Sequence, residues 1–337
     1  MKAMVIVRGE KGGKLEWRDV PVPERGPGDL LIRVKATSLN RADLYQLLGT
    51  YATQTARGGY ASQTPAGGSP VIAGLEAAGE VVGVGKDVTG FAVGDRVMGT
   101  CTGGFAEFTI LDYRLAIPVP ARLSWEEAGT IPIAYMTEHN ALVTNGRLQA
   151  GEAALIHAAS SGVGVAAIQI AKLYGAKPVM GTTGASAKLE ALKALGMDLG
   201  INYRTENFAD AVLAATHGAG AGVIIDHVGG PYLKENLRCL AVKGRLVSVG
   251  RLGGTTAELD LELMALKRLQ LIGVTFRTRT LEEKIAIVRD VVTDLLPALA
   301  DGRLRPVIDR VFPLDQAAEA QAYMASNTQL GKIVLKV

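Results

Sequence analysis

The stretch EAALIHAASSGVGVAAIQIAK, residues 152–172, predicts a buried strand, a turn of small residues and then a helix. Residues 153–157 form the apolar strand, and Gly162, Val163 and Gly164 open the helix. The free backbone N–H groups and positive dipole end of such a helix favour a pyrophosphate. Small side chains would let the diphosphate approach the backbone, so the stretch predicts a dinucleotide site.

The dinucleotide fingerprint Gly-x-Gly-x-x-Gly falls here on Ala159, Ser161 and Gly164, so only its last position is glycine. One alternative is an ordinary tight turn that leads into a buried helix. Another is a membrane span, because residues 153–171 are almost uncharged. The polar side chains inside this stretch argue against a span, since they would lack partners in hydrocarbon.

The composition is that of a two-domain α/β protein. The chain has 337 residues, of which 48% are hydrophobic, 5% are aromatic and 41 are glycine. A net charge of +3 without a run of Lys or Arg argues against nucleic-acid binding. Cys101 and Cys239 lie too far apart for a metal knuckle or a disulfide framework, and residues 1–8 look like a strand rather than a signal peptide. We therefore expect a cytoplasmic protein without membrane association.

The pattern of apolar residues divides the chain into two parts. Up to about residue 124, short apolar segments split by Gly and Pro predict a partly open β-barrel, with strands at 3–8, 30–38, 80–84, 96–99 and 105–110. From Trp125 onward strands alternate with single helices, which predicts a doubly wound parallel sheet. Its expected strands are 153–157, 178–182, 200–202, 222–226, 244–249 and 271–275.

The remaining segments complete this division. Helices are expected at 126–143, 187–195, 208–215, 232–240, 261–269 and 281–300, and a last strand at 332–336. The final helix and strand most plausibly return to the first domain. The predicted domains are therefore residues 1–124 with 278–337, and residues 125–277.

The segment after the second predicted strand of the parallel sheet indicates the cofactor. NAD enzymes place a carboxylate there to bind the ribose diol, but residues 182–188 contain none and end on Lys188. A lysine with neighbouring hydroxyls could hold a 2′-phosphate, so NADPH is predicted. The alternative is that Lys188 is only a solvated helix residue.

Metal chemistry is not expected. The four histidines, His139, His157, His217 and His227, are scattered, and none stands at metal-ligand spacing with a cysteine. His157 lies in a predicted buried strand and is interpreted as a core residue.

Several motifs resemble those of one family over nearly the whole chain. They are Asn40-Arg-Ala-Asp-Leu44, Gly49-Thr-Tyr51, Gly74-Leu-Glu76, Val93-Gly-Asp-Arg-Val97, the turn at 158–164, Asn202-Tyr-Arg204, Asp226-His-Val-Gly-Gly230 and Gly331-Lys-Ile-Val334. Together they resemble the zinc-free quinone oxidoreductases of the medium-chain dehydrogenase/reductase superfamily. The resemblance implies a GroES-like barrel domain and a Rossmann domain. It also implies that no metal is bound, because Leu75 stands where zinc-dependent relatives carry a histidine ligand.

The resemblance further implies the cofactor contacts. Asn40 and Thr137 would lie near the nicotinamide, Ser161, Gly162 and Val163 on the pyrophosphate, and Gly184, Lys188 and Tyr203 around the 2′-phosphate. The rest of the groove would be lined by His227, Val228, Gly250, Phe276, Arg277 and Asn327. This chain departs from the family at His227, at residues 136–139, and in a tract at 49–66 that contains a tandem duplication. We interpret that tract as a surface loop or an active-site lid.

The function expected from these features is hydride transfer from NADPH to a quinone or to a carbon–carbon double bond conjugated to a carbonyl. Alternatives are an enoyl-thioester or haloacrylate-type reductase and a non-catalytic NADPH-binding protein. Asn40 and Tyr51 are the candidate catalytic residues, and Tyr51 is the candidate proton donor. Its duplicate Tyr60 is the competing choice. An apolar edge strand at 271–275 predicts a homodimer.

Overall fold

The structure is a computed structural model that describes residues 1–9, 12–48 and 70–337. The chain forms two compact units, one of Met1–Met136 with Phe276–Val337 and one of Thr137–Thr275. The division falls after Met136 instead of residue 124. Residues 125–136 belong with the first unit because they pack there, and the Ile133 N–H donates to Oε2 of Glu76.

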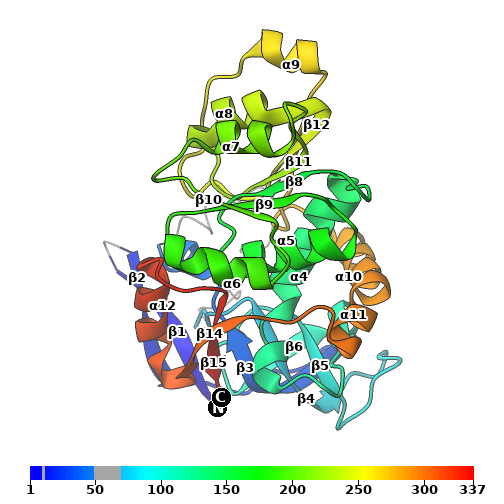
Figure 1. Ribbon diagram of the computed structural model, residues 1–337. Coiled ribbons are helices and arrows are strands. Elements are labelled where there is room, and N and C mark those ends of the chain that lie inside the picture. The colour runs from blue at the N-terminus through cyan, green and yellow to red at the C-terminus, as the bar shows by residue number, and fades with distance from the viewer. Residues whose placement is uncertain (10–11, 49–69) are drawn as a thin grey trace. The chain divides into compact units, whose positions relative to one another are not determined.

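The first unit is built mainly from antiparallel strands (Figure 1). A two-stranded sheet pairs β1 (Lys2–Gly9) with β2 (Gly12–Asp19). A seven-stranded sheet runs in the order β14-β15-β3-β4-β5-β7, and β6 pairs with β3. Its strands are β3 (Asp29–Ser38), β4 (Glu76–Val84), β5 (Arg96–Thr100), β6 (Phe108–Asp112), β7 (Ala116–Pro118), β14 (Ile308–Pro313) and β15 (Lys332–Lys336).

Strand β3 is the centre of this sheet, because it pairs with β15, β4 and β6. Two register shifts along the β3–β4 pair bend the strand, as bulges do. Gly74 has a φ of 97°, and a Cβ there would lie 2.4 Å from the ring of Phe105. Only glycine fits, so the chain enters β4 at a defined place and carries Glu76 into the interior.

The second unit is a six-stranded parallel sheet in the order β10-β9-β8-β11-β12-β13. Its strands are β8 (Ala154–Ile156), β9 (Val179–Thr183), β10 (Leu199–Asn202), β11 (Ala221–Asp226), β12 (Leu240–Ser248) and β13 (Gln270–Gly273). All six were predicted, and the parallel arrangement is confirmed. In chain order the strands read 3-2-1-4-5-6, the order of dinucleotide-binding sheets.

Helices cover both faces of this sheet. Figure 1 shows α5 (Gly162–Leu173) and α6 (Leu189–Ala194) on one face, and α7 (Phe208–Ala215) and α8 (Leu233–Cys239) on the other. The change of face follows from right-handed crossovers, because the chain reverses its direction across the sheet after β10. Helix α9 (Leu261–Lys267) leads into the edge strand β13.

Some predicted helices are broken. The expected helix at 126–143 is α3 (Trp125–Ala128), α4 (Ile131–His139) and a π-helix, η2 (Asn140–Asn145). The expected helix at 281–300 is α10 (Leu281–Asp294) followed by α11 (Leu296–Asp301), because a proline stands in the first turn of α11. Periodicity alone does not reveal such breaks.

Other elements were not predicted, namely β2, β7, β14 and α12 (Ala317–Ala325). Helix α1 (Arg41–Leu47) follows β3. Among the described residues, no helix combines the length and apolarity that a membrane crossing requires.

Candidate functional site

The predicted phosphate turn lies at the carboxyl end of β8. Ala158 adopts a positive φ of 50°, which is uncommon for a residue with a side chain. The Ser161 hydroxyl caps α5 by accepting from the Gly164 N–H at 3.0 Å. The first helical bond runs from the Val165 N–H to the carbonyl of Ser161, so the N–H groups of Gly162 and Val163 belong to the open first turn. That turn has the donors that a pyrophosphate needs.

Gly164 shows why the last fingerprint position is glycine. A Cβ there would lie 2.4 Å from the carbonyl oxygen of Ala158, so helix and turn could not pack as closely with any side chain. The first two fingerprint positions tolerate Ala159 and Ser161 because the positive φ falls on Ala158 instead. The fingerprint does not predict the positive φ of Ala158, because that residue precedes its first position.

The predicted 2′-phosphate residues come together at the carboxyl ends of β9 and β10. A Cβ on Gly184 would lie 2.5 Å from the Tyr203 hydroxyl and 3.0 Å from Nε of Arg204. Asn202 joins the two segments, because its Nδ2 donates to the Ser186 hydroxyl at 2.8 Å and its Oδ1 accepts from the Arg204 N–H. Lys188 is half-buried in the same short 3₁₀ turn, Ser186–Lys188. Sequence reasoning missed Arg204, although it follows Tyr203 directly.

A chain of hydrogen bonds runs beneath the carboxyl ends of β8, β9 and β11. Nε2 of His157 lies 2.7 Å from Oδ1 of Asn236, whose Nδ2 donates to Oδ2 of Asp226. Because Oδ1 can only accept, the His157 proton resides on Nε2, and Nδ1 accepts from the Thr182 hydroxyl at 3.0 Å. Burial lowers the pKa of His157. The interpretation of His157 as a core residue is confirmed, since it is fully buried and hydrogen-bonded on both nitrogens.

A second buried pair lies on the β11 side of the sheet. His227 directly follows β11, and its Nε2 lies 3.4 Å from Oε1 of Glu138 on α4. Burial raises the pKa of Glu138 well above its usual value. Burial, with a contribution from His157, lowers the pKa of His227 to about 3. Desolvation thus favours the uncharged form of both groups.

Val228 and Gly250 lie beside His227. The Val228 N–H donates to Oδ1 of Asp226 at 2.7 Å, which turns the chain directly after β11. A Cβ on Gly250 would lie 2.6 Å from the His227 carbonyl oxygen, so the two loops pack backbone to backbone. These three predicted residues therefore form one cluster in the second unit.

The first unit contains a buried network around Asn40. Its Nδ2 donates to Oε1 of Glu76 at 2.7 Å, and its Oδ1 accepts from Nζ of Lys332 at 2.8 Å. Lys332 also donates to Oε1 of Glu76 at 2.9 Å, and the Ser38 hydroxyl donates to the same oxygen. Both ends of the Asn40 amide are thus engaged inside this unit. Its predicted role toward the nicotinamide remains a prediction.

The other predicted residues are distributed as follows. Thr137 is half-buried on α4, and Phe276 and Arg277 are half-buried at the start of the second segment of the first unit. Asn327 is exposed and accepts from Nη2 of Arg41 at 2.7 Å. Tyr51, Tyr60 and the duplicated tract at 49–66 lie outside the described residues.

No cluster of three or more His, Cys, Asp or Glu side chains that could hold a metal is found across residues 1–9, 12–48 and 70–337. Both cysteines are buried and free.

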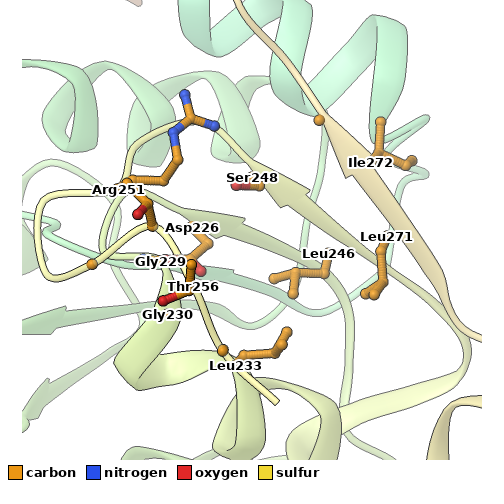
Figure 2. Close-up of a pocket in the computed structure, with 14 residues that line it drawn as sticks. Asp226, Gly229, Gly230, Leu233, Leu246, Ser248, Arg251, Thr256, Leu271 and Ile272 are labelled. Atoms are coloured by element: carbon orange, nitrogen blue, oxygen red, sulfur yellow. The ribbon is translucent and has the colours of Figure 1, made fainter. Parts of the chain in front are cut away.

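A pocket of about 250 Å³ lies in the second unit, on the β11–β13 half of the sheet. Figure 2 shows Leu233, Leu246 and Leu271 lining it, with the guanidinium of Arg251 directed away from them. None of the predicted cofactor residues lines this pocket. The candidate cofactor site therefore lies at the strand ends of the second unit and not in this pocket.

Comparisons with known proteins identify the family. A family model described as the alcohol dehydrogenase GroES-like domain matches residues 26–121, and one described as zinc-binding dehydrogenase matches residues 162–290. The quinone oxidoreductase of Rattus norvegicus is 31% identical over 94% of this chain and 92% of its own length. A phenolphthiocerol/phthiocerol polyketide synthase of Mycobacterium tuberculosis is 34% identical over the whole chain, which spans 15% of that protein.

Solved structures agree. The CurK enoyl reductase superposes with a TM-score of 0.85 at 28% identity, covering 99% of this chain and 98% of that chain. The mycobacterial protein Rv1454c in complex with NADPH superposes with a TM-score of 0.85 at 26% identity, over all of both chains. The GroES-like and Rossmann-type fold predicted from the motifs is therefore confirmed. The chain belongs to the quinone oxidoreductase-like branch of the medium-chain dehydrogenase/reductase superfamily.

Proposed function

We propose that this protein is an NADPH-dependent reductase that works without a metal and transfers hydride to a quinone or to a double bond conjugated to a carbonyl. The observation that carries the cofactor assignment is the end of β9. Residues 184–188, directly after this strand, contain no carboxylate. Gly184 lies beside Tyr203 and Arg204, and Lys188 ends the 3₁₀ turn that follows. Two cations and a phenol suit a 2′-phosphate, which a carboxylate would repel.

The residues present fit a dinucleotide. The open first turn of α5 would hold the pyrophosphate, and its position at the carboxyl end of β8 is where parallel sheets bind such ligands. NADPH, when bound, supplies the hydride. The protein would orient the cofactor and the acceptor, exclude water and stabilise the developing negative charge.

Metal independence is supported by the chemistry of the donors at Glu76. Its Oε1 accepts from Ser38, Asn40 and Lys332, and its Oε2 accepts from the Ile133 N–H. Lys332 already neutralises this carboxylate, and Leu75 offers no ligand atom. Conjugated acceptors need no Lewis acid, because conjugation already lowers the barrier to hydride attack.

A second candidate is reduction of an enoyl thioester, which the similarity to the CurK enoyl reductase favours. A haloacrylate-type acceptor and non-catalytic NADPH binding are further alternatives. We also propose that the protein acts in the cytoplasm on a small electron-poor molecule, as a homodimer, without nucleic-acid or membrane partners.

The test is a panel of quinones, enals, enones and enoyl thioesters, followed by the loss of NADPH absorbance and repeated with NADH. Turnover of quinones or enones with a preference for NADPH supports the proposal. Turnover of enoyl thioesters with quinones untouched favours the second candidate. Tight NADPH binding without oxidation by any acceptor contradicts both.

A further inference from the structure

Glu138 and His227 are an unusual pair for a protein interior. The Glu138 side chain is fully buried and that of His227 is 5% exposed. Nε2 of His227 lies 3.4 Å from Oε1 of Glu138. Yet neither carboxyl oxygen nor this nitrogen has a well-formed hydrogen bond within the part of the chain that the structure describes. Buried polar atoms are rarely left in this state, because burial without partners is costly.

The protonation state follows from these surroundings. A buried ion pair persists only where further donors satisfy the carboxylate, and in the described chain none reaches Glu138. The neutral form is therefore favoured, in which Glu138 carries a proton that faces Nε2. The imidazole proton of His227 then resides on Nδ1. The pair thus stores one carboxyl proton next to an imidazole that can accept it.

The location of the pair in the second unit is informative. A dinucleotide lies across the two halves of such a sheet, with its pyrophosphate at the first βα turn. The candidate 2′-phosphate residues lie on the half made by β8, β9 and β10. The other half, which begins with β11, would then face the nicotinamide end, and His227 is the first residue after β11.

The helix that carries Glu138 supports a functional role. Immediately after His139, the α-helix α4 changes into the π-helix η2. Asn145 stabilises the wider turn by donating to both the carbonyl and the side-chain oxygen of Asn140. Single π-turns inside helices occur frequently at functional sites.

We propose that Glu138 and His227 supply the proton that completes reduction of a conjugated double bond. This inference rests on the proposed function. NADPH, when bound, would supply the hydride for the new C–H bond at the β-carbon, and the π-electron pair of the double bond would shift to form the enolate. The Nδ1–H bond of His227 breaks as its proton joins the enolate. The Glu138 proton moves to Nε2. Solvent later returns a proton to Nδ1 as the Nε2 proton moves back to Glu138, so one hydride and one proton are added to the substrate and the starting tautomer is restored.

The variants Glu138→Gln and Glu138→Ala separate proton donation from positioning. A glutamine amide can still donate to Nε2 and hold the same imidazole tautomer, but it has no acidic proton. Alanine removes both properties. Glu190→Gln makes the same chemical change on the surface, where that side chain is 82% exposed, and is the matched control.

The readout is the ratio of kcat for an enone to kcat for a quinone, because the hydroquinone anion does not need a proton during the rate-limiting step. General acid catalysis contributes about 100-fold or more, so Glu138→Gln should lower this ratio by roughly that factor. The Glu190→Gln control should leave the ratio unchanged. An unchanged ratio in Glu138→Gln together with a lowered ratio in Glu138→Ala would mean that Glu138 only positions His227, which overturns the proposal. A ratio that responds to Tyr51→Phe and not to Glu138→Gln overturns it too.

A second measurement does not depend on turnover. The infrared difference spectrum of wild type minus Glu138→Gln should show the C=O stretch of a protonated carboxylic acid at neutral pH. If Glu138→Gln does not fold, the imidazole ¹⁵N spectrum of the wild type shows which nitrogen of His227 carries the proton. The chain has four histidines, so the signals can be assigned. A carboxylate band for Glu138, or a His227 imidazole with its proton on Nε2 alone, would overturn the proposal. If the wild-type protein fails to oxidise NADPH with every acceptor of the panel, the proposed function is contradicted. The two spectra test the protonation of Glu138 and His227 independently of that result.

Discussion

Nζ of Lys332 on β15 lies 2.9 Å from Oε1 of Glu76 on β4, and both side chains are buried. A second ion pair of the same length, Lys336 with Glu126, starts from the same strand but lies at the surface, where the lysine side chain is 63% exposed. The two pairs differ in burial and in the hydrogen bonds that Ser38 and Asn40 add to the buried one. They therefore allow a buried, hydrogen-bonded ion pair to be compared with an exposed one on the same strand.

Lys332→Met should destabilise the first unit by about 3–5 kcal/mol, because it leaves the Glu76 charge buried without its cation. The double variant Glu76→Gln with Lys332→Met should lose less than the sum of the single variants. Both tryptophans, Trp17 and Trp125, belong to this unit, so tryptophan fluorescence during urea unfolding reports on it alone.

Lys336→Met is the control for this experiment. An exposed pair contributes about 1 kcal/mol or less. Equal losses for Lys332→Met and Lys336→Met would show that the Glu76 network does not depend on its cation.

Lys188→Glu and Arg204→Ala should each weaken NADPH binding far more than NADH binding. Each removes a charge-assisted contact to the 2′-phosphate, which is worth about 1.5–3 kcal/mol, or roughly 10- to 100-fold in Kd. Titration of both cofactors by fluorescence measures the effect. Lys193→Ala, on α6 beside Glu190, removes a surface cation of the same kind and should change neither affinity. Equal losses for NADPH and NADH would refute the assignment.

The stability of the first unit should depend on pH through Asp43. Burial, with a contribution from Glu76, raises the pKa of Asp43 from 3.8 to about 7, although the Asn40 N–H and Lys332 oppose the shift. A raised pKa in the folded state means that the stabilising effect is complete below about pH 4 and is lost as the pH rises through about 7.

Asp43→Asn stays neutral and lacks this dependence. The stability of the wild type relative to Asp43→Asn should therefore fall by up to roughly 4 kcal/mol between acidic and neutral pH, since one pKa unit corresponds to about 1.4 kcal/mol. Urea unfolding of both proteins across this range checks the sign. A parallel pH profile for the two proteins would show that Asp43 ionises normally.

The apolar strand β13 should pair with a second copy of the chain. It is the edge strand of the parallel sheet, and Leu271 on it is 39% exposed. A lysine on an edge strand discourages such pairing. Light scattering at micromolar concentration should give a dimer for the wild type and a smaller mass for Leu271→Lys. A monomeric wild type would exclude this mode of assembly.

Local pattern was enough to predict the parallel sheet. Each of its strands is a short apolar run bounded by turn residues, and each crossover is a single helix, so neighbouring residues specify both. The phosphate turn was predictable for the same reason, because Ser161 to Gly164 lie next to each other in sequence. The absence of a carboxylate after β9 could likewise be read directly.

Elements stabilised by distant contacts were not predictable in this way. Strand β2 is mostly polar and forms by pairing with β1, and β14 forms by pairing with β15. The helix around Glu138 was expected to run on to residue 143, but its end is a π-helix in which the Asn145 side chain bonds to Asn140. Arg204 joined the 2′-phosphate candidates only when Gly184 was seen beside it.

The sequence by itself determined the family, the two kinds of domain and the phosphate turn, because these depend on residues that are close together along the chain. Only the tertiary structure paired Glu76 with Lys332, which are 256 residues apart, and Glu138 with His227. Such pairs arise where strands and helices from distant parts of the chain meet in a buried space. Their protonation then depends on burial and on the number of donors present, which no sequence motif states.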